Sequence, residues 1–116
     1  MKVVLIDDEL DICVIVKFML ERAGHEVTSF TSPEVAKDYL SQSNFDVVIS
    51  DFQMTPLNGL SLFRWLKDVN PHYKPFILLT GEPLMDPEEL KKEGIHQVLF
   101  KPHGLDDIAE VLKQLN

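Results

Sequence analysis

Short apolar blocks alternate along the chain with longer stretches in which apolar residues recur every three or four positions. Continuous apolar blocks are typical of strands that are covered on both faces, as in a parallel sheet. The blocks predict five strands, at residues 3–6, 27–30, 45–50, 76–79 and 98–100. The second block, with the sequence VTSF, is the most polar and is therefore expected at an edge of the sheet.

The stretches between the blocks have the period of amphipathic helices. The first helix should end at Gly24, because glycine suits the left-handed conformation that closes many helices. Its predicted inward residues are Ile12, Ile15, Val16, Met19, Leu20 and Ala23. The second helix should begin with Ser32 as its N-cap and Pro33 as its first residue. Its predicted inward residues are Val35, Ala36, Tyr39 and Leu40.

Three more helices complete the pattern. The third is predicted from about Asn58 to Val69, where it stops before Pro71. The fourth, Pro87 to Glu93, has little to bury except Leu90 and ends at Gly94. The predicted stripe of the fifth helix consists of Leu105, Ile108, Ala109, Leu112 and Leu115. Five strands alternating with five helices predict an α/β domain over residues 1–116, with a parallel sheet and right-handed crossovers.

Polar residues that can carry chemistry follow four of the predicted strands. Asp7 and Asp8 follow the first strand, Asp51 the third, Thr80 the fourth and Lys101 the fifth. Taken singly, each has an ordinary explanation, as a helix N-cap or a solvated lysine. In open α/β sheets, however, sites lie beyond the carboxyl ends of the strands. Carboxylates about 5 Å apart repel by roughly 3 kcal/mol at an effective dielectric near 20, so three together favour a bound cation, and hard oxygen ligands favour Mg²⁺.

Composition narrows the possible partners and compartment. The 116 residues carry a formal net charge of −8, which argues against direct binding to nucleic acid or to an anionic membrane and favours a basic partner surface. No apolar run approaches the roughly 20 residues of a membrane span, and the N-terminal residues do not have the pattern of a signal peptide. We therefore expect a cytoplasmic protein, and a single cysteine suits that compartment.

Four motifs occur in a specific order: IDDE at residues 6–9, VVISD at 47–51, LLTGE at 78–82 and FKP at 100–102. With them, the chain resembles the receiver domains of two-component response regulators from Lys2 to Leu115. The resemblance implies a flavodoxin-like, doubly wound fold whose parallel strands have the order 2-1-3-4-5. It also implies a protein that catalyses only its own phosphorylation and dephosphorylation.

The resemblance further implies a role for each residue at the acidic edge. Asp51 would accept a phosphoryl group from a histidine of a sensor kinase or a phosphotransfer protein. Asp8, Asp51 and the backbone carbonyl of Gln53 would bind Mg²⁺ directly, and Asp7 would hold it through water.

Two further residues would contact the transferred phosphoryl group. Lys101 would pair with one phosphoryl oxygen, and Thr80 would donate its hydroxyl to another. The family resemblance also implies a cis bond between Lys101 and Pro102.

Phosphorylation in the family shifts the population toward a conformer with a changed output surface. Here that surface corresponds to the predicted helix 87–93, strand 98–100 and helix 105–115, and it is the first place to look for a dimer. The chain departs from many relatives in having Val98 where they place an aromatic switch residue, and in placing Pro56 one position later in the loop after Asp51.

The exposed face of the first helix supplies a hypothesis about docking. The predicted phase leaves Cys13, Val14 and Phe18 outward, near the acidic edge. Either this patch packs against kinase or phosphotransfer helices, or it has no role beyond the scattered exposure that is common on protein surfaces.

Two other functions stay open from the sequence. A degenerate receiver would bind partners without being phosphorylated. A Mg²⁺-dependent phosphohydrolase also uses a strand-end aspartate, but such enzymes typically carry Asp-x-Asp on the first strand, whereas Asp7 is followed two places later by Glu9.

Overall fold

A computed structural model of the chain describes residues 1–70, 72 and 74–115, without the side chain of His103. Five parallel strands form one sheet in the order β2-β1-β3-β4-β5. The strands are β1 (Lys2–Ile6), β2 (Glu26–Phe30), β3 (Val47–Asp51), β4 (Phe76–Thr80) and β5 (Gln97–Phe100). The predicted fold class and strand order are therefore confirmed, and the polar second strand lies at an edge.

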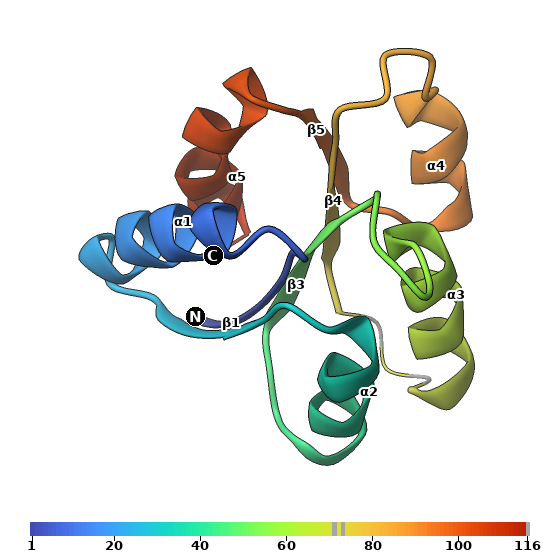
Figure 1. Cartoon of the computed structure of the whole chain (residues 1–116), viewed down its shortest axis with the longest axis horizontal. Helices are drawn as coiled ribbons and strands as arrows, with labels where there is room; N and C mark the ends of the chain where they lie inside the picture. The colour runs from blue at the N-terminus through green and yellow to red at the C-terminus, as the bar shows by residue number, and fades with distance from the viewer. Residues whose placement is uncertain (71, 73, 116) are drawn as a thin grey trace.

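Helices cover both faces of the sheet, with α1 and α5 on one side and α2, α3 and α4 on the other (Figure 1). The helices are α1 (Leu10–Arg22), α2 (Pro33–Gln42), α3 (Gly59–Val69), α4 (Pro87–Glu93) and α5 (Ile108–Gln114), and a 3₁₀ turn (His103–Asp107) precedes α5. A bilayer-spanning helix needs roughly 20 mostly apolar residues. None of the helices in the described part of the chain meets that requirement.

Alternating side chains of the strands divide the core into two layers. Val4, Ile6 and Leu78 pack toward α2, α3 and α4, whereas Leu5 and Ile49 pack toward α1 and α5. All five residues of β3 and of β4 are buried. Continuous apolar blocks in the sequence thus correspond to strands with a helical layer on each face.

Side-chain caps start three helices where the sequence predicts them. The Ser32 hydroxyl accepts a hydrogen bond from Val35 N, and Asn58 Oδ1 accepts one from Ser61 N. Asp86 Oδ1 accepts a bond from Glu88 N at the start of α4. At the other ends, Gly24 and Gly94 have positive φ, at 96° and 125°. The side-chain oxygens satisfy N–H groups that have no partner within the helix, so each cap fixes where its helix begins.

The predicted inward face of α1 was correct at Val16 and Leu20, but Ile15 faces outward and Cys13, predicted outward, faces inward. Cys13 is only 2% exposed, whereas Ile15 is 51% exposed. The Cys13 thiol donates to the backbone oxygen of Asp7 at 3.2 Å and also lies within reach of Phe30 O. A small side chain with a weak donor therefore fits the narrow space beside the ends of β1 and β2, and the bulkier isoleucine faces outward.

Other differences from the prediction are local. Ala23 follows the end of α1 and is exposed, and Val35 on α2 is 54% exposed instead of inward. The fifth predicted helix is divided, since a 3₁₀ turn occupies its first part. Gly104 lies so close to β5 that an added Cβ would meet Leu99 Cβ at 2.8 Å. A 3₁₀ turn, which is tighter than an α-helix, occupies this segment before α5 begins.

Gly59 sets how closely α3 approaches the end of β3. A Cβ on this residue would overlap the backbone oxygen of Asp51 and lie 2.9 Å from Leu78 Cδ1. Gly59 N also donates to Phe52 O at 2.9 Å, so the loop between β3 and α3 is held tightly at Asp51.

We predict that Gly59→Ala destabilises the protein by about 1–3 kcal/mol, because overpacking must push α3 away from β3. The matched control is Gly81→Ala, where the new Cβ would lie 3.9 Å from Gln53 Oε1. That variant should stay within about 0.5 kcal/mol of wild type. Urea unfolding followed by circular dichroism measures both, and equal stability of the two variants would contradict the predicted clash.

Candidate functional site

Four strands deliver polar side chains to one edge of the sheet. Asp7 follows β1, Asp51 and Thr80 are the last residues of β3 and β4, and Lys101 follows β5. Asp7 and Thr80 are fully buried, and Asp51 is 2% exposed. Because β1, β3, β4 and β5 are consecutive neighbours in the sheet, residues far apart in the sequence meet beyond their carboxyl ends.

Lys101 joins two of the buried carboxylates. Its Nζ lies 2.9 Å from Asp7 Oδ2 and 3.2 Å from Asp51 Oδ1. The Lys101 side chain is 16% exposed, so both ion pairs are largely shielded from water. Removing this ammonium would leave two buried anions next to each other, which is far more costly than losing an exposed ion pair.

Two exposed acids extend the cluster toward solvent. One carboxylate oxygen each from Asp7, Asp8, Glu9 and Asp51 lies within 4.8 Å of all the others. The nearest Glu9 oxygen is 3.8 Å from Lys101 Nζ. Four carboxylates against one ammonium leave a formal charge of −3. Such a set of hard oxygen donors suits Mg²⁺ or Ca²⁺ better than a metal that prefers nitrogen or sulfur.

The electrostatics of the cluster shift the pKa values of its central pair. Burial, reinforced by the charge of Asp7, raises the pKa of Asp51 from 3.8 to about 6, although Lys101 acts in the opposite direction. Burial also tends to lower the pKa of Lys101, but its hydrogen bond to Asp7 and the charges of Asp7 and Asp51 outweigh that effect and raise it. Asp51 is thus a carboxylate whose charge is poorly compensated, next to a lysine that stays protonated.

Thr80 and Gln53 lie near this cluster but are not bonded to it. The Thr80 hydroxyl accepts a hydrogen bond from Glu82 N at 2.9 Å, at the start of the β4–α4 loop. In the described part of the chain, no hydrogen bond joins that hydroxyl to Asp51 or Lys101. Gln53 is exposed, and its Oε1 lies 3.9 Å from where a Cβ on Gly81 would be. The structure therefore brings Asp7, Asp8, Asp51 and Lys101 together, whereas the Thr80 side chain is buried beside them and the Gln53 side chain is exposed.

Sequence reasoning missed two contributors to the cluster. Glu9 belongs to it, and the run of three acids after β1 was the available signal. Cys13 helps to position Asp7, since its thiol donates a hydrogen bond to the backbone carbonyl of that residue. Burial and the neighbouring Asp7 raise the pKa of the Cys13 thiol to about 11, so it remains a neutral donor. Its spacing from Val16 and Leu20, three and seven positions, was the signal for an inward residue.

The β3–α3 and β5–α5 loops frame the site. Ser50 donates its hydroxyl to the backbone oxygen of Asp51 at 3.0 Å. The bond between Lys101 and Pro102 is cis, as the family resemblance implied, and the bond between Thr55 and Pro56 is cis as well. Lys101 N donates to Thr80 O at 2.8 Å, which ties the start of the β5–α5 loop to the end of β4.

Beside the site, α4 is attached mainly through its C-terminal end. Only Leu90 of this helix is buried. Arg64 on α3 forms two hydrogen bonds to the Glu93 carboxylate, at 2.7 and 2.9 Å, and Lys67 Nζ donates to the Glu93 carbonyl. Val98 and Phe100 of β5 pack into the core layer that also includes α4, so they share a face of the strand.

An exposed apolar patch begins directly after the acidic cluster. It consists of Leu10, Val14, Ile15 and Phe18 on α1, which are 64%, 59%, 51% and 60% exposed. Leu10, Val14 and Phe18 are four residues apart and therefore form one stripe along the helix. We call these four residues the α1 patch.

Known proteins share both sequence and fold with this chain. The heme response regulator HssR of Staphylococcus epidermidis is 30% identical over 110 residues, which is 94% of this chain and 48% of that protein. The chain thus spans about half the length of this curated relative.

Two solved structures are similar over nearly the whole chain. A response regulator receiver domain protein from Clostridium thermocellum is 34% identical and has a TM-score of 0.85, covering 97% of this chain and 91% of that one. The response regulator TrrA of Thermotoga maritima, solved in complex with Mg²⁺-BeF, has a TM-score of 0.86 at 24% identity, covering 99% and 98%.

The family model described as the response regulator receiver domain matches residues 3–113. This match covers the acidic cluster, Lys101 and all five strands apart from Lys2, the first residue of β1. The chain therefore belongs to the receiver domains of two-component response regulators.

Proposed function

We propose that the chain receives a phosphoryl group on Asp51 from a phosphohistidine and transmits that event to a partner protein. The observation that carries this proposal is the pairing of a buried, poorly compensated carboxylate with the Lys101 ammonium 3.2 Å away. A new bond forms between an Asp51 oxygen and phosphorus while the phosphorus–nitrogen bond of the donor breaks and its imidazole leaves. The product is an acyl phosphate at the end of β3, which is held in place by the close packing of Gly59 at the start of α3.

Lys101 has the right charge and position to stabilise the transferred group. An ammonium has three N–H donors, and two of them point to Asp7 and Asp51. The third N–H group is available for a phosphoryl oxygen. Lys101 can also keep its contact with Asp51 after that side chain has been phosphorylated. The Thr80 hydroxyl accepts from Glu82 N, so its own O–H group could donate to another phosphoryl oxygen, and a hydroxyl shared in this way would couple the β4–α4 loop to the phosphoryl group.

The acidic cluster fits a Mg²⁺ ion. Asp8, Asp51 and the backbone carbonyl of Gln53 would hold it directly and Asp7 through water. When bound, the ion neutralises charge on the transferring group and on the carboxylates, so that two anions can approach. The donor set supports this assignment, and the similar TrrA structure contains Mg²⁺-BeF.

The α1 patch is the proposed docking surface for the phosphodonor, a sensor kinase or histidine phosphotransfer protein. It begins one residue after Glu9, so helices packed on it would reach the acidic edge. Four exposed apolar side chains on one helix also suit packing between helices. Signal output would pass through α4, β5 and α5, because α4 has only one buried residue and the loop that precedes it begins directly after Thr80.

Phosphorylation itself is directly testable. Incubation with Mg²⁺ and acetyl phosphate should add the mass of one phosphoryl group to the wild-type protein, as read by intact mass spectrometry. Asp51→Asn should not gain this mass, because an amide is not a competent nucleophile here. The control Asp38→Asn, at an exposed position on α2, should behave as wild type. An unmodified wild type that still binds a partner would instead favour a degenerate receiver.

Asp51→Asn should also stabilise the protein when divalent ions are absent. Because burial raises the folded-state pKa of Asp51 to about 6 from 3.8, its charge is unfavourable above that range, and this cost fades as the pH falls toward 3.8. At pH 7.5 with EDTA, the variant should gain about 1–3 kcal/mol in free energy of unfolding, and much less at pH 4.5.

Added Mg²⁺ should raise the melting temperature of the wild type and narrow its difference from Asp51→Asn, because ligands that bind the folded state stabilise it. Urea unfolding at the two pH values and a Mg²⁺ titration measure these effects. A variant that is less stable than wild type at pH 7.5 would show that Lys101 already compensates the charge fully.

Docking on the α1 patch predicts a selective defect. Val14→Lys combined with Phe18→Ser should slow phosphoryl transfer from a purified histidine kinase about tenfold or more, as expected when a docking hot spot is lost. Transfer from acetyl phosphate should not change, because the acidic cluster is intact. Val69→Lys, at an apolar position on α3 that is 50% exposed, is the control. An unchanged kinase rate in the double variant would remove the α1 patch from the docking model.

A further inference from the structure

Arg22 continues the line of exposed residues that begins with the α1 patch. Leu10, Val14 and Phe18 are four residues apart, and Arg22 follows at the same spacing in the last turn of α1. Its guanidinium carbon lies 5.6 Å from the centroid of the Phe18 ring. With a rise of about 1.5 Å per residue, the line from Leu10 to Arg22 runs roughly 18 Å along the helix. A cation therefore stands at the end of the apolar surface that is farther from the acidic cluster.

The Arg22 guanidinium is held by the ring but not by a carboxylate. Arg22 is exposed, and none of the ion pairs among the residues that the structure describes involves it. Phe18 is itself 60% exposed, so the pair lies on the surface. The N–H groups of a guanidinium lie in its plane, and stacking on a ring leaves them available for a second partner. The contact with Phe18 thus presents a set of donors at a defined place on α1.

Arg64, the other arginine of the chain, forms a different kind of contact. Its side chain forms two hydrogen bonds with the Glu93 carboxylate, at 2.7 and 2.9 Å, and so joins α3 to α4. The planar guanidinium matches a carboxylate in this paired geometry. One arginine is therefore satisfied by a carboxylate of the chain itself, whereas Arg22 is left to find one elsewhere.

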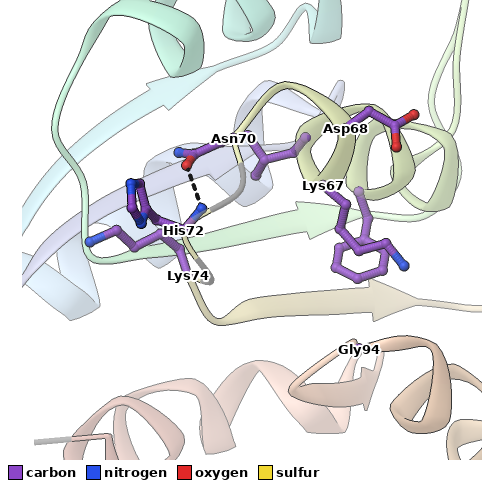
Figure 2. A pocket seen from close by; sticks show the side chains of 8 residues that line it. Lys67, Asp68, Asn70, His72, Lys74 and Gly94 are labelled. Atoms are coloured by element: carbon purple, nitrogen blue, oxygen red, sulfur yellow. Dashed lines mark hydrogen bonds between the residues drawn. The ribbon is translucent and has the colours of Figure 1, made fainter.

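The other cations that lie over rings in the described part of the chain link two helices. Lys67 on α3, labelled in Figure 2, lies 5.0 Å from the Phe63 ring centroid and also donates to the backbone oxygen of Glu93 on α4. Lys37 on α2 lies 5.2 Å from the centroid of the Trp65 ring on α3. These contacts serve the fold. The cation and the ring of the α1 contact lie on the same helix, so that contact joins no two elements.

Arg22 also differs in sign from most of the surface. The formal net charge is −8, and the acidic cluster of Asp7, Asp8, Glu9 and Asp51 lies at the opposite end of the α1 patch. An acidic group on a partner is therefore repelled by the chain as a whole and attracted beside a cation that no carboxylate neutralises. Along α1 the surface is acidic at one end, apolar in the middle and cationic at the other end, which favours one direction for a partner helix.

We propose that the phosphodonor carries a carboxylate that pairs with Arg22. This inference rests on the proposed docking of the phosphodonor on the α1 patch. The partner would present a helix with an apolar stripe for Val14 and Phe18 and an acidic residue one turn beyond that stripe. Because Phe18 already holds the guanidinium, the ion pair forms with little further loss of side-chain freedom. The pair would select the partner and its direction, while the apolar residues supply most of the affinity.

The test titrates alanine-based helical peptides that share one leucine stripe into the ¹⁵N-labelled chain. One peptide carries glutamate one turn before the stripe, another carries it one turn after, and the reference has glutamine at both places. The wild type should bind one of the glutamate peptides about two- to fivefold more tightly than the reference, as expected for an exposed ion pair. The amide shifts should centre on residues 14–22 of α1. The net charge of −8 predicts the opposite order of affinities, so the sign of the difference is informative.

Arg22→Gln should abolish the preference for glutamate. The matched control Lys91→Gln removes one positive charge from an exposed position on α4 and should keep the preference. The binding measurements involve no phosphorylation, so their outcome does not depend on whether Asp51 accepts a phosphoryl group.

The proposal is overturned by any of the following results. A reference peptide that binds the wild type at least as tightly as both glutamate peptides would remove the ion pair. Peptides that do not saturate, or that shift signals away from α1, would remove the surface. A preference that survives Arg22→Gln, or that is lost equally in Lys91→Gln, would show that it has another origin.

Discussion

The contact of one lysine with two buried aspartates is the interaction on which the site depends. Asp7 and Asp51 stand at the ends of adjacent strands, where the sheet fixes their separation, and Lys101 reaches both from the far side of β4. The ammonium offsets only part of the charge, since four carboxylates gather there. The fold therefore stores unfavourable electrostatic energy at the place where a cation and a phosphoryl group can relieve it.

The surrounding structure is what makes this energy usable. Gly59 allows α3 to start against the carbonyl of Asp51, and Ser50 and Phe52 fix the same stretch through hydrogen bonds. At the end of β1, the Cys13 thiol donates a hydrogen bond to the backbone oxygen of Asp7. The strand ends that carry Asp7 and Asp51 therefore cannot move apart to relax the repulsion of these two carboxylates without breaking these contacts. By contrast, α4 has one buried residue and is bonded to α3 through Glu93 at its C-terminal end. It is therefore the element that can change position at a small cost in free energy.

Most of the fold could be predicted because its signals are local. Continuous apolar blocks gave the strands, and Ser32, Asn58 and Gly94 marked helix ends through chemistry that acts within a few residues. On α1, the inward position of Cys13 was missed although its spacing from Val16 and Leu20 indicated it, whereas its bonds to Asp7 and Phe30 could not be predicted because these residues lie in other segments. The split of the last helix had the same origin, namely the contact of Gly104 with Leu99. At the site, the proximity of Asp7, Asp51 and Lys101 followed from the strand order. The orientation of the Thr80 hydroxyl could not be predicted in this way, because it depends on a hydrogen bond from Glu82 N in the following loop.

The α1 patch has a consequence for how the isolated protein behaves in solution. Four apolar side chains that are each more than half exposed on one helix form a surface to which another copy can adhere. At neutral pH, the net charge of −8 keeps copies apart through mutual repulsion. Near the isoelectric point this repulsion disappears, and copies of the protein should then associate first through the α1 patch.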